Sequence, residues 1–373
     1  MNRKELNELK KRFKIEQCSI TRMRGCYVSQ DGECLGTMNK LFLSLPEEEI
    51  FKYLRMFAGC MKGKLGEKLQ NLHVADDDPY ETVSESLENL RKTKLKDEET
   101  FMQVCTNIME NYETASNYMI LAIHDVYDIP GVTEDGAEME DTSDSVYEYI
   151  VLYICPVYQP MPYIGLQPGK QFGAVTPPFC MAAPRIALTY PAFNDRRADP
   201  RGALLYQAEG MCGESIVKTL CRCEVGMSDT QKKDIIQKIF ESSLSESSSF
   251  KQLKKIYEIV TGRLLEWERD TDLMMDKEDV MSILEEAGIP EEQTELFAEE
   301  WDNRFGKNES VPAKKIIDEK KLRVETEGAV INVKPEGLSK TMIERANGDV
   351  FLTIQITGRT EVNGVATKGG DAG

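Results

Sequence analysis

Two stretches of the chain carry apolar residues on both of their alternating faces. The first, 146–157, reads VYEYIVLYICPV, and the second, 118–127, reads YMILAIHDVY. A strand that is apolar on both faces is covered on both sides in a folded domain. The pattern predicts two central strands, and the acidic, turn-rich segment 130–144 between them favours antiparallel pairing.

Helical and hairpin patterns surround these two strands. Apolar residues recur at helical spacing in the N-terminal half, and Asp31-Gly32 is a turn signal between two strand-like runs. We expect helices over 2–14, from Pro46 towards 72 and over 96–112, and a hairpin of 18–28 with 34–43. This mixture predicts an α+β fold, an antiparallel sheet domain with flanking helices over 1–209.

The pattern changes twice after this domain. From Gly210 the period becomes helical, which predicts a helical module over 210–310. A C-terminal β element follows over 311–357, where Asn347-Gly348 is the strongest hairpin signal. We expect a disordered tail over 358–373, and an irregular surface excursion over 156–191, which holds eight prolines.

Charge is distributed unevenly along the chain. The net charge is −18, which argues against a protein that coats nucleic acid through overall positive charge. Residues 1–24 hold eight Lys or Arg against three acids, a net +5, whereas residues 264–309 hold four against sixteen, a net −12. The two ends of the chain are therefore suited to partners of opposite charge.

The cysteines and the apolar runs bear on location. Ten cysteines in 373 residues do not form a disulfide scaffold, and several lie on apolar faces as reduced cysteine does. No run has signal-peptide character or approaches the roughly 18 apolar residues of a membrane helix. We expect a protein in the cytoplasm, with no membrane partner, and no metal or cofactor is predicted.

Candidate chemistry is sparse. His124 lies within a predicted strand, where a core or hydrogen-bonded role is favoured over a general base. Arg196, Arg197 and Arg201 gather on a turn that could grip phosphate, but Asp195 and Asp199 could neutralise them in a structural salt-bridge knot. The two interpretations stay open. The basic N-terminal segment is the second candidate surface, with a solvated helix face as its alternative.

Several quoted segments carry a family resemblance. KELNELKKRF, CSITRMRGCYV, SLPEEEIFKYLRMF and AFNDRRADPRGALLY resemble a family of Firmicutes proteins known only as a domain of unknown function, over nearly the whole chain. More distantly, the C-terminal half resembles nucleoid-associated proteins of the NdpA type in its order of elements. The segments concerned are RIALTYPAF, ESIVKTLCRCEVG, DKEDVMSILEEAGI and GAVINVKPEGLSKTMIERANGDVFLTI. This second resemblance implies a link to the bacterial nucleoid.

We therefore expect a non-enzymatic binding protein associated with nucleic acid. Its candidate phosphate contacts are Arg196, Arg197, Arg201, Lys11, Arg12, Arg22 and Arg24. The first alternative is a protein-interaction adaptor that presents its acidic helical module to a basic partner. The second is a metal-dependent phosphate-handling enzyme, which would need Asp195, Asp199 and Glu209 to surround a metal ion.

Overall fold

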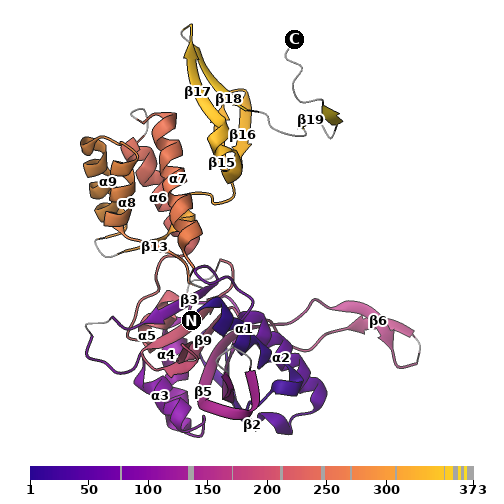
Figure 1. The fold of residues 1–373 in the computed structure, drawn as a ribbon. Helices are drawn as coiled ribbons and strands as arrows, with labels where there is room; N and C mark the ends of the chain where they lie inside the picture. The colour runs from indigo at the N-terminus through magenta and orange to yellow at the C-terminus, as the bar shows by residue number, and fades with distance from the viewer. Residues whose placement is uncertain are drawn as a thin grey trace. The chain divides into compact units, whose positions relative to one another are not determined.

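The computed structural model divides the chain into two compact units, Met1–Ser228 and Asp229–Gly373 (Figure 1). The structure describes residues 1–75, 78–132, 138–169, 171–210, 213–244, 248–268, 271–306, 309–347, 349–355, 360–362 and 365–367. Both units combine helices with antiparallel strands, so the predicted α+β class is confirmed.

The first unit is built on an eight-stranded sheet whose pairings are antiparallel. The strand order is β2-β1-β4-β5-β9-β12-β3, and β8 pairs with the end of β5. The strands are β1 (Arg22–Val28), β2 (Cys34–Leu41), β3 (Leu69–His73), β4 (Tyr118–Val132), β5 (Glu138–Tyr158), β8 (Cys180–Met181), β9 (Ile186–Tyr190) and β12 (Gly202–Gln207). The hairpin predicted around Asp31-Gly32 is β1–β2, and Gly32 takes the positive φ of 80° that its turn requires.

Strands β4 and β5 form the centre of this sheet. They pair antiparallel, with Ile120 opposite Ile154 and Ala122 opposite Leu152, as their apolar patterns predicted. Alternate residues of each strand belong to two separate cores, one on each face of the sheet. The prediction of central strands that are covered on both sides is therefore confirmed.

Helices α3 (Glu85–Lys92), α4 (Glu98–Asn111) and α5 (Glu214–Leu220) cover one face (Figure 1). Ser84 and Asp97 cap the first two by accepting hydrogen bonds from backbone N–H groups of the first turn. Their apolar stripes, which include Leu87, Phe101 and Val104, pack on β4 and β5. This layer buries an aliphatic core.

Helices α1 (Arg3–Lys11) and α2 (Glu47–Cys60) cover the opposite face, with short helical turns at Ile15–Gln17 and Phe42–Ser44. Asn2 and Glu5 form a capping box at the start of α1. The core below these helices is rich in aromatic rings, and Phe57 of α2 stacks on Tyr153 of β5 at 4.4 Å between ring centroids. The two faces of the sheet thus carry different chemistry.

The segment expected to be irregular contains regular structure. Between β5 and β8 the chain forms a hairpin of β6 (Tyr163–Gln167) and β7 (Gln171–Val175). Its prolines lie outside the two strands, in the flanks and at position 168 between the strands, where they do not interrupt the ladder. A second small hairpin, β10 (Ala192–Asn194) with β11 (Arg197–Asp199), follows β9.

The second unit begins with helices and ends in hairpins. The helices are α6 (Asp229–Leu244), α7 (Phe250–Glu266), α8 (Lys277–Glu286), α9 (Glu291–Arg304) and α10 (Ala313–Ile316). Asp276 caps α8 through a capping box, and Gly288 with φ of 80° follows its end. The strands are β13 (Met274–Met275), β14 (Val311–Pro312), β15 (Leu322–Thr326), β16 (Ala329–Val333), β17 (Thr341–Ala346), β18 (Asp349–Ile354), β19 (Thr360–Val362) and β20 (Val365–Thr367), with a helical turn at Pro335–Lys340.

Two boundaries differ from the expectation. The predicted helical module started at 210, but α5 packs in the core of the first unit, and the units divide after Ser228. The change to a helical pattern at 210 announces the helix α5 and not the border between the two units. The tail expected to be disordered includes the paired strands β19 and β20, while the rest of 358–373 lies outside the described residues.

Among the helices described, none is long and apolar enough to cross a membrane.

Candidate functional site

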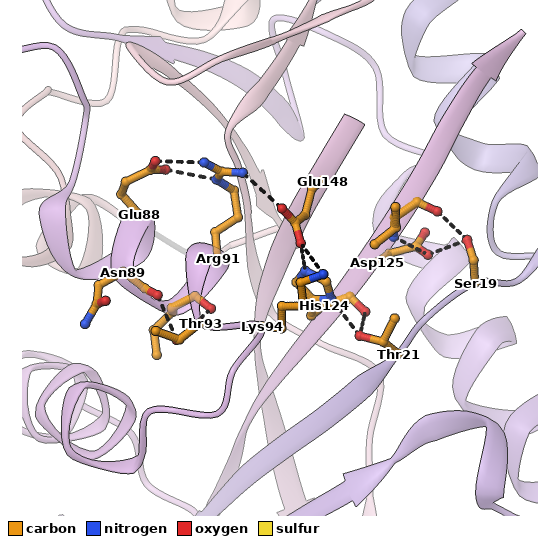
Figure 2. Close-up of polar contacts among 12 residues, drawn as sticks. Ser19, Thr21, Glu88, Asn89, Arg91, Thr93, Lys94, His124, Asp125 and Glu148 are labelled. Atoms are coloured by element: carbon orange, nitrogen blue, oxygen red, sulfur yellow. Dashed lines mark hydrogen bonds and ion pairs between the residues drawn. The ribbon is translucent and has the colours of Figure 1, made fainter. Parts of the chain in front are cut away.

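A network of polar side chains lies on the α3 side of the central strands (Figure 2). His124 of β4 is fully buried, and both of its ring nitrogens are bonded. Nδ1 lies 2.6 Å from Thr21 Oγ1, and Nε2 lies 2.9 Å from Glu148 Oε1 of β5. Burial lowers the pKa of His124, against the pull of Glu148. The predicted core, hydrogen-bonded role of His124 is confirmed.

The network continues from Glu148 into α3. Arg91 donates to Glu148 at 3.4 Å and forms a two-pronged pair with Glu88 at 2.7 and 2.9 Å. The hydroxyl of Tyr190 also donates to Glu88, at 3.0 Å. Burial opposes ionisation of Glu88, yet the hydrogen bonds and charges of Arg91 and Lys92 prevail and lower its pKa to about 2. These contacts tie α3 to the strands β5 and β9.

A second buried group, Asp125, lies next to His124 in sequence but faces the α1 side. Asp125 accepts hydrogen bonds from the Tyr149 hydroxyl at 2.7 Å and from Ser19 Oγ at 2.8 Å. The guanidinium of Arg12 lies 3.8 Å away. Burial raises the pKa of Asp125 although these partners favour its charged form. The carboxyl is thus buried and bonded from three directions.

The order hydroxyl, imidazole, carboxylate in Thr21, His124 and Glu148 resembles the arrangement used in nucleophilic catalysis. However, the imidazole has no exposed surface on which a substrate could lie. Within the described ranges, no three His, Cys, Asp or Glu side chains come together as metal ligands. The run of acids at 76–78 lies partly outside these ranges. The geometry therefore supports a structural network that joins helices to strands.

The arginine turn is bonded to the protein itself. Arg196 donates to Glu8 Oε1 and to the carbonyl of Pro130, each at 3.1 Å. Arg201 donates to the carbonyl oxygens of Ala75, Asp78 and Tyr80, at 2.6 to 3.2 Å. Asp195 and Asp199 are not the partners of these two guanidinium groups in the described part of the chain. Arg197 alone of the three is exposed.

The other predicted contacts also fall into two groups. Arg24 is 4% exposed, donates to the carbonyls of Leu95 and Lys96, and pairs with Glu98 at 3.1 Å. Arg12 lies over the Tyr127 ring at 4.7 Å and bonds to Ser19. Arg22 donates to Asn39, whereas Lys11 is exposed on α1. Lys11 and Arg197 are thus the predicted residues left facing solvent.

The basic N-terminal segment was named as a candidate surface by the sequence analysis, which missed one residue that belongs to it. Arg3 and Lys10, seven residues apart, lie on the same side of α1, and Lys62 from the turn after α2 is close to them. Partial burial, together with the charges of Arg3 and Lys62, lowers the pKa of Lys10. We call Arg3, Lys10, Lys11 and Lys62 the basic face. No local sequence signal links Lys62 to α1, because only the fold brings them together.

Comparison with known proteins places the chain in a family. No curated protein matches the sequence. A family profile matches residues 1–365, nearly the whole chain. The resemblance to a domain of unknown function, read from the four quoted segments, is therefore confirmed, while the resemblance to NdpA-type proteins has no support from these comparisons. The chain belongs to the family described as Domain of unknown function (DUF4317).

Proposed function

We propose that the chain is a non-enzymatic binding protein whose basic face holds the phosphates of nucleic acid. The basic face supports this proposal better than the arginine turn does, because its cations do not bond to the protein's own carboxylates. Among the described residues, no carboxylate lies within ion-pair distance of Arg3, Lys10 or Lys62. These residues are therefore available to an external anion.

The observation that carries the proposal is the gathering of like charges. Positive side chains repel one another, and the energy rises as they approach and lose water. Partial burial is the main cause of the lowered pKa of Lys10, and the positive charges of Arg3 and Lys62 lower it further. An anion that joined the three would convert this repulsion into attraction. Nucleic acid presents phosphates at short, regular spacing, so one strand could contact several of these cations.

The test is a titration of labelled duplex DNA with the full chain at several salt concentrations. The anisotropy of the labelled DNA reports binding. Three or four phosphate contacts predict a slope of log K against log salt of about −3 to −4. The triple variant Arg3→Gln, Lys10→Gln, Lys62→Gln should bind more weakly and lose most of this slope. Because phosphates carry no base information, the loss should be equal for different sequences.

A matched control removes the same charge elsewhere. Lys40, Lys251 and Lys321 are exposed, and changing all three to Gln leaves the net charge equal to that of the test variant. This control should bind DNA nearly as well as the wild type. If the folded wild type does not bind at high micromolar concentration and low salt, or if both triple variants weaken equally, the proposal is wrong.

The arginine turn stays a separate prediction. Arg196 bonds to Glu8, and Arg201 bonds to described backbone carbonyls of the segment 75–80. Changing either arginine to Ala should therefore first lower the stability of the first unit. Arg197 is exposed, so Arg197→Gln tests binding without this complication. A stable Arg197→Gln variant with weaker DNA binding would extend the binding surface to the turn.

A second candidate, the adaptor, is favoured by one helix of the second unit. Glu291, Glu292, Glu295 and Glu299 of α9 are exposed, and none forms an ion pair with a described residue. Such a row of carboxylates could steer a basic partner. An oligolysine probe should bind the wild type more tightly than the variant with all four changed to Gln.

The control for this candidate replaces four other exposed acids. Glu33, Glu81, Glu110 and Glu327 come from different parts of the chain, and their change to Gln removes the same charge. Equal loss of oligolysine binding in both variants would mean that net charge alone attracts the probe. That result would remove the adaptor hypothesis.

A further inference from the structure

A hairpin arm extends from the sheet of the first unit. It comprises residues 159–179, between β5 and β8, and includes the strands β6 and β7 (Figure 1). Ile164 pairs with Ala174, and Leu166 pairs with Phe172. Because directly opposed residues of an antiparallel pair point to the same face, Ile164, Leu166 and Phe172 share one face of the arm.

This face of the arm is apolar and open to solvent. Ile164 is 70% exposed, Leu166 63% and Phe172 75%. The arm also exposes Met161 at 86% and Phe179 at 60%. Soluble proteins rarely leave so many large apolar side chains together in water unless the surface binds a partner.

The opposite face of the hairpin carries fewer large apolar side chains. A Cβ atom on Gly165 would lie 2.8 Å from the Tyr163 ring and 3.1 Å from Val175, so the ring packs over the glycine while 56% of Tyr163 stays exposed. Gln171 makes the far end of this face polar. The difference between the faces assigns the docking surface to Ile164, Leu166 and Phe172.

A hollow lies near the base of the same arm. Its volume is about 580 Å³, and its lining includes Tyr53, Met56 and Gly59 of α2 together with Met181 and Ala183. Met181 belongs to β8 and pairs with Val157 of β5, directly before the arm begins. The base hollow and the arm thus belong to one region of one unit.

We propose that the apolar face of the arm docks on a second copy of this chain. A two-fold axis across the middle of an arm brings a second arm alongside it in the opposite direction. The far ends of β6 and β7 then reach the base hollow of the other copy. Such an interface is self-complementary, because each copy supplies one arm and one hollow.

The exposed area agrees with a stable dimer. Aromatic side chains each bury about 150–250 Å² when fully covered, and Met, Ile and Leu come near the lower end of that range. Apart from Tyr163 on the other face, the arm region exposes six such side chains by half or more: Tyr158, Met161, Ile164, Leu166, Phe172 and Phe179. Covering these six would bury roughly 700 Å² per copy, or roughly 1,400 Å² for two arms, within the usual range for a specific interface.

Sedimentation velocity of the full chain over a range of concentrations tests the proposal. The wild type should form a dimer that dissociates on dilution. Leu166→Asp with Phe172→Asp places charge on the docking face and should give a monomer at every concentration. Leu265→Asp is the matched control, because Leu265 is 82% exposed but lies in the second unit. It should leave the dimer unchanged.

A second variant addresses the hollow itself. Nothing lies within 4 Å of a Cβ atom built on Gly59, so Gly59→Phe should fold and fill the base hollow. This variant should also be a monomer. A mixture of the arm variant with Gly59→Phe should form a weaker heterodimer, since one intact arm still meets one intact hollow.

Each variant must give the same circular dichroism spectrum as the wild type, which shows that it is folded. A wild type that stays monomeric at high micromolar concentration would refute the proposal and leave the arm to a different protein. A dimer that survives the double change in the arm would refute it as well.

Discussion

The hydroxyl of Tyr149 offers the clearest test of the buried polar contacts. Tyr149→Phe removes the hydrogen bond to Asp125, which is 2.7 Å long and lies where both residues have no exposed surface. The phenyl ring keeps its place in the core. The variant therefore measures one hydrogen bond to a buried carboxyl.

The expected loss in free energy of unfolding depends on whether the acceptor of the hydrogen bond is charged. A hydrogen bond to an ionised group contributes about 1.5–3 kcal/mol, and a neutral one about 0.5–1.5 kcal/mol. Tyr147 provides the matched control, because its ring stacks on Tyr149 and its hydroxyl donates at 2.7 Å to the neutral carbonyl of Pro191. We expect Tyr149→Phe to lower the free energy of unfolding by about 2 kcal/mol and Tyr147→Phe by about 1 kcal/mol.

The pH dependence separates the two variants further. Burial raises the pKa of Asp125, so the folded state holds its proton more tightly than the unfolded state. The stability from this protonation is complete below the unfolded pKa of about 3.9 and is lost as the pH rises through the folded pKa. Below the unfolded pKa, Asp125 is neutral, and the cost of Tyr149→Phe should approach that of Tyr147→Phe.

Urea unfolding monitored by hydrogen exchange of β4 and β5 peptides measures this cost. Both tryptophans of the chain, Trp267 and Trp301, lie in the second unit, so their fluorescence provides an internal reference that should not change. If Tyr149→Phe costs no more than Tyr147→Phe at neutral pH, Asp125 is not charged in the folded state and the reasoning fails.

Three further predictions concern the first unit. Because the pKa of Glu88 is lowered to about 2, its contribution to stability is present above the unfolded pKa of about 4.3 and is lost as the pH falls through about 2. The urea midpoint of the wild type should therefore fall in acid, and that of Glu88→Gln should fall less. Parallel curves of midpoint against pH would contradict this. The sulfurs of Cys26 and Cys34 lie 3.2 Å apart, so a mild thiol oxidant should form a disulfide between them within one molecule. Peptide mapping detects this disulfide, and Cys34→Ser should prevent it. A map without the disulfide would contradict the short distance between the two sulfurs. Arg24→Met should destabilise by about 1–3 kcal/mol because it leaves the buried carbonyl of Leu95 and the partly buried carbonyl of Lys96 without their donor, whereas Arg22→Met at the surface should cost less than about 0.5 kcal/mol. Thermal melts with equal losses would mean that the contacts of Arg24 contribute little.

The centre of the fold could be predicted because its signal is local. Strands β4 and β5 alternate apolar residues on both faces, and few structures other than a covered strand accept that pattern. His124 and Asp125 interrupt the pattern with two adjacent polar residues, and the burial of His124 required a partner on the neighbouring strand. The capping of α8 by Asp276 is a local feature too, since a cap acts within one turn.

The features that sequence reasoning missed depend on contacts between distant residues. One of the two interpretations of the arginine turn paired Arg196 with Asp195 or Asp199, but its carboxylate partner is Glu8, 188 positions earlier. Lys62 reaches Arg3 and Lys10 only through the packing of α2 beside α1. The arm was expected to be irregular because proline and glycine dominate its composition, although the short strands between them pair normally.

The order of strands in the sheet has a consequence for synthesis on the ribosome. The edge strand β3 ends at His73, but its pairing partner β12 ends at Gln207, so 134 further residues must be made before β3 can pair. At about 5–20 residues per second, this takes roughly 7–27 s. During that interval Leu69 and Leu72, both buried in the finished fold, have no strand to pack beside. The nascent chain should therefore be a client of ribosome-associated chaperones until β12 has emerged.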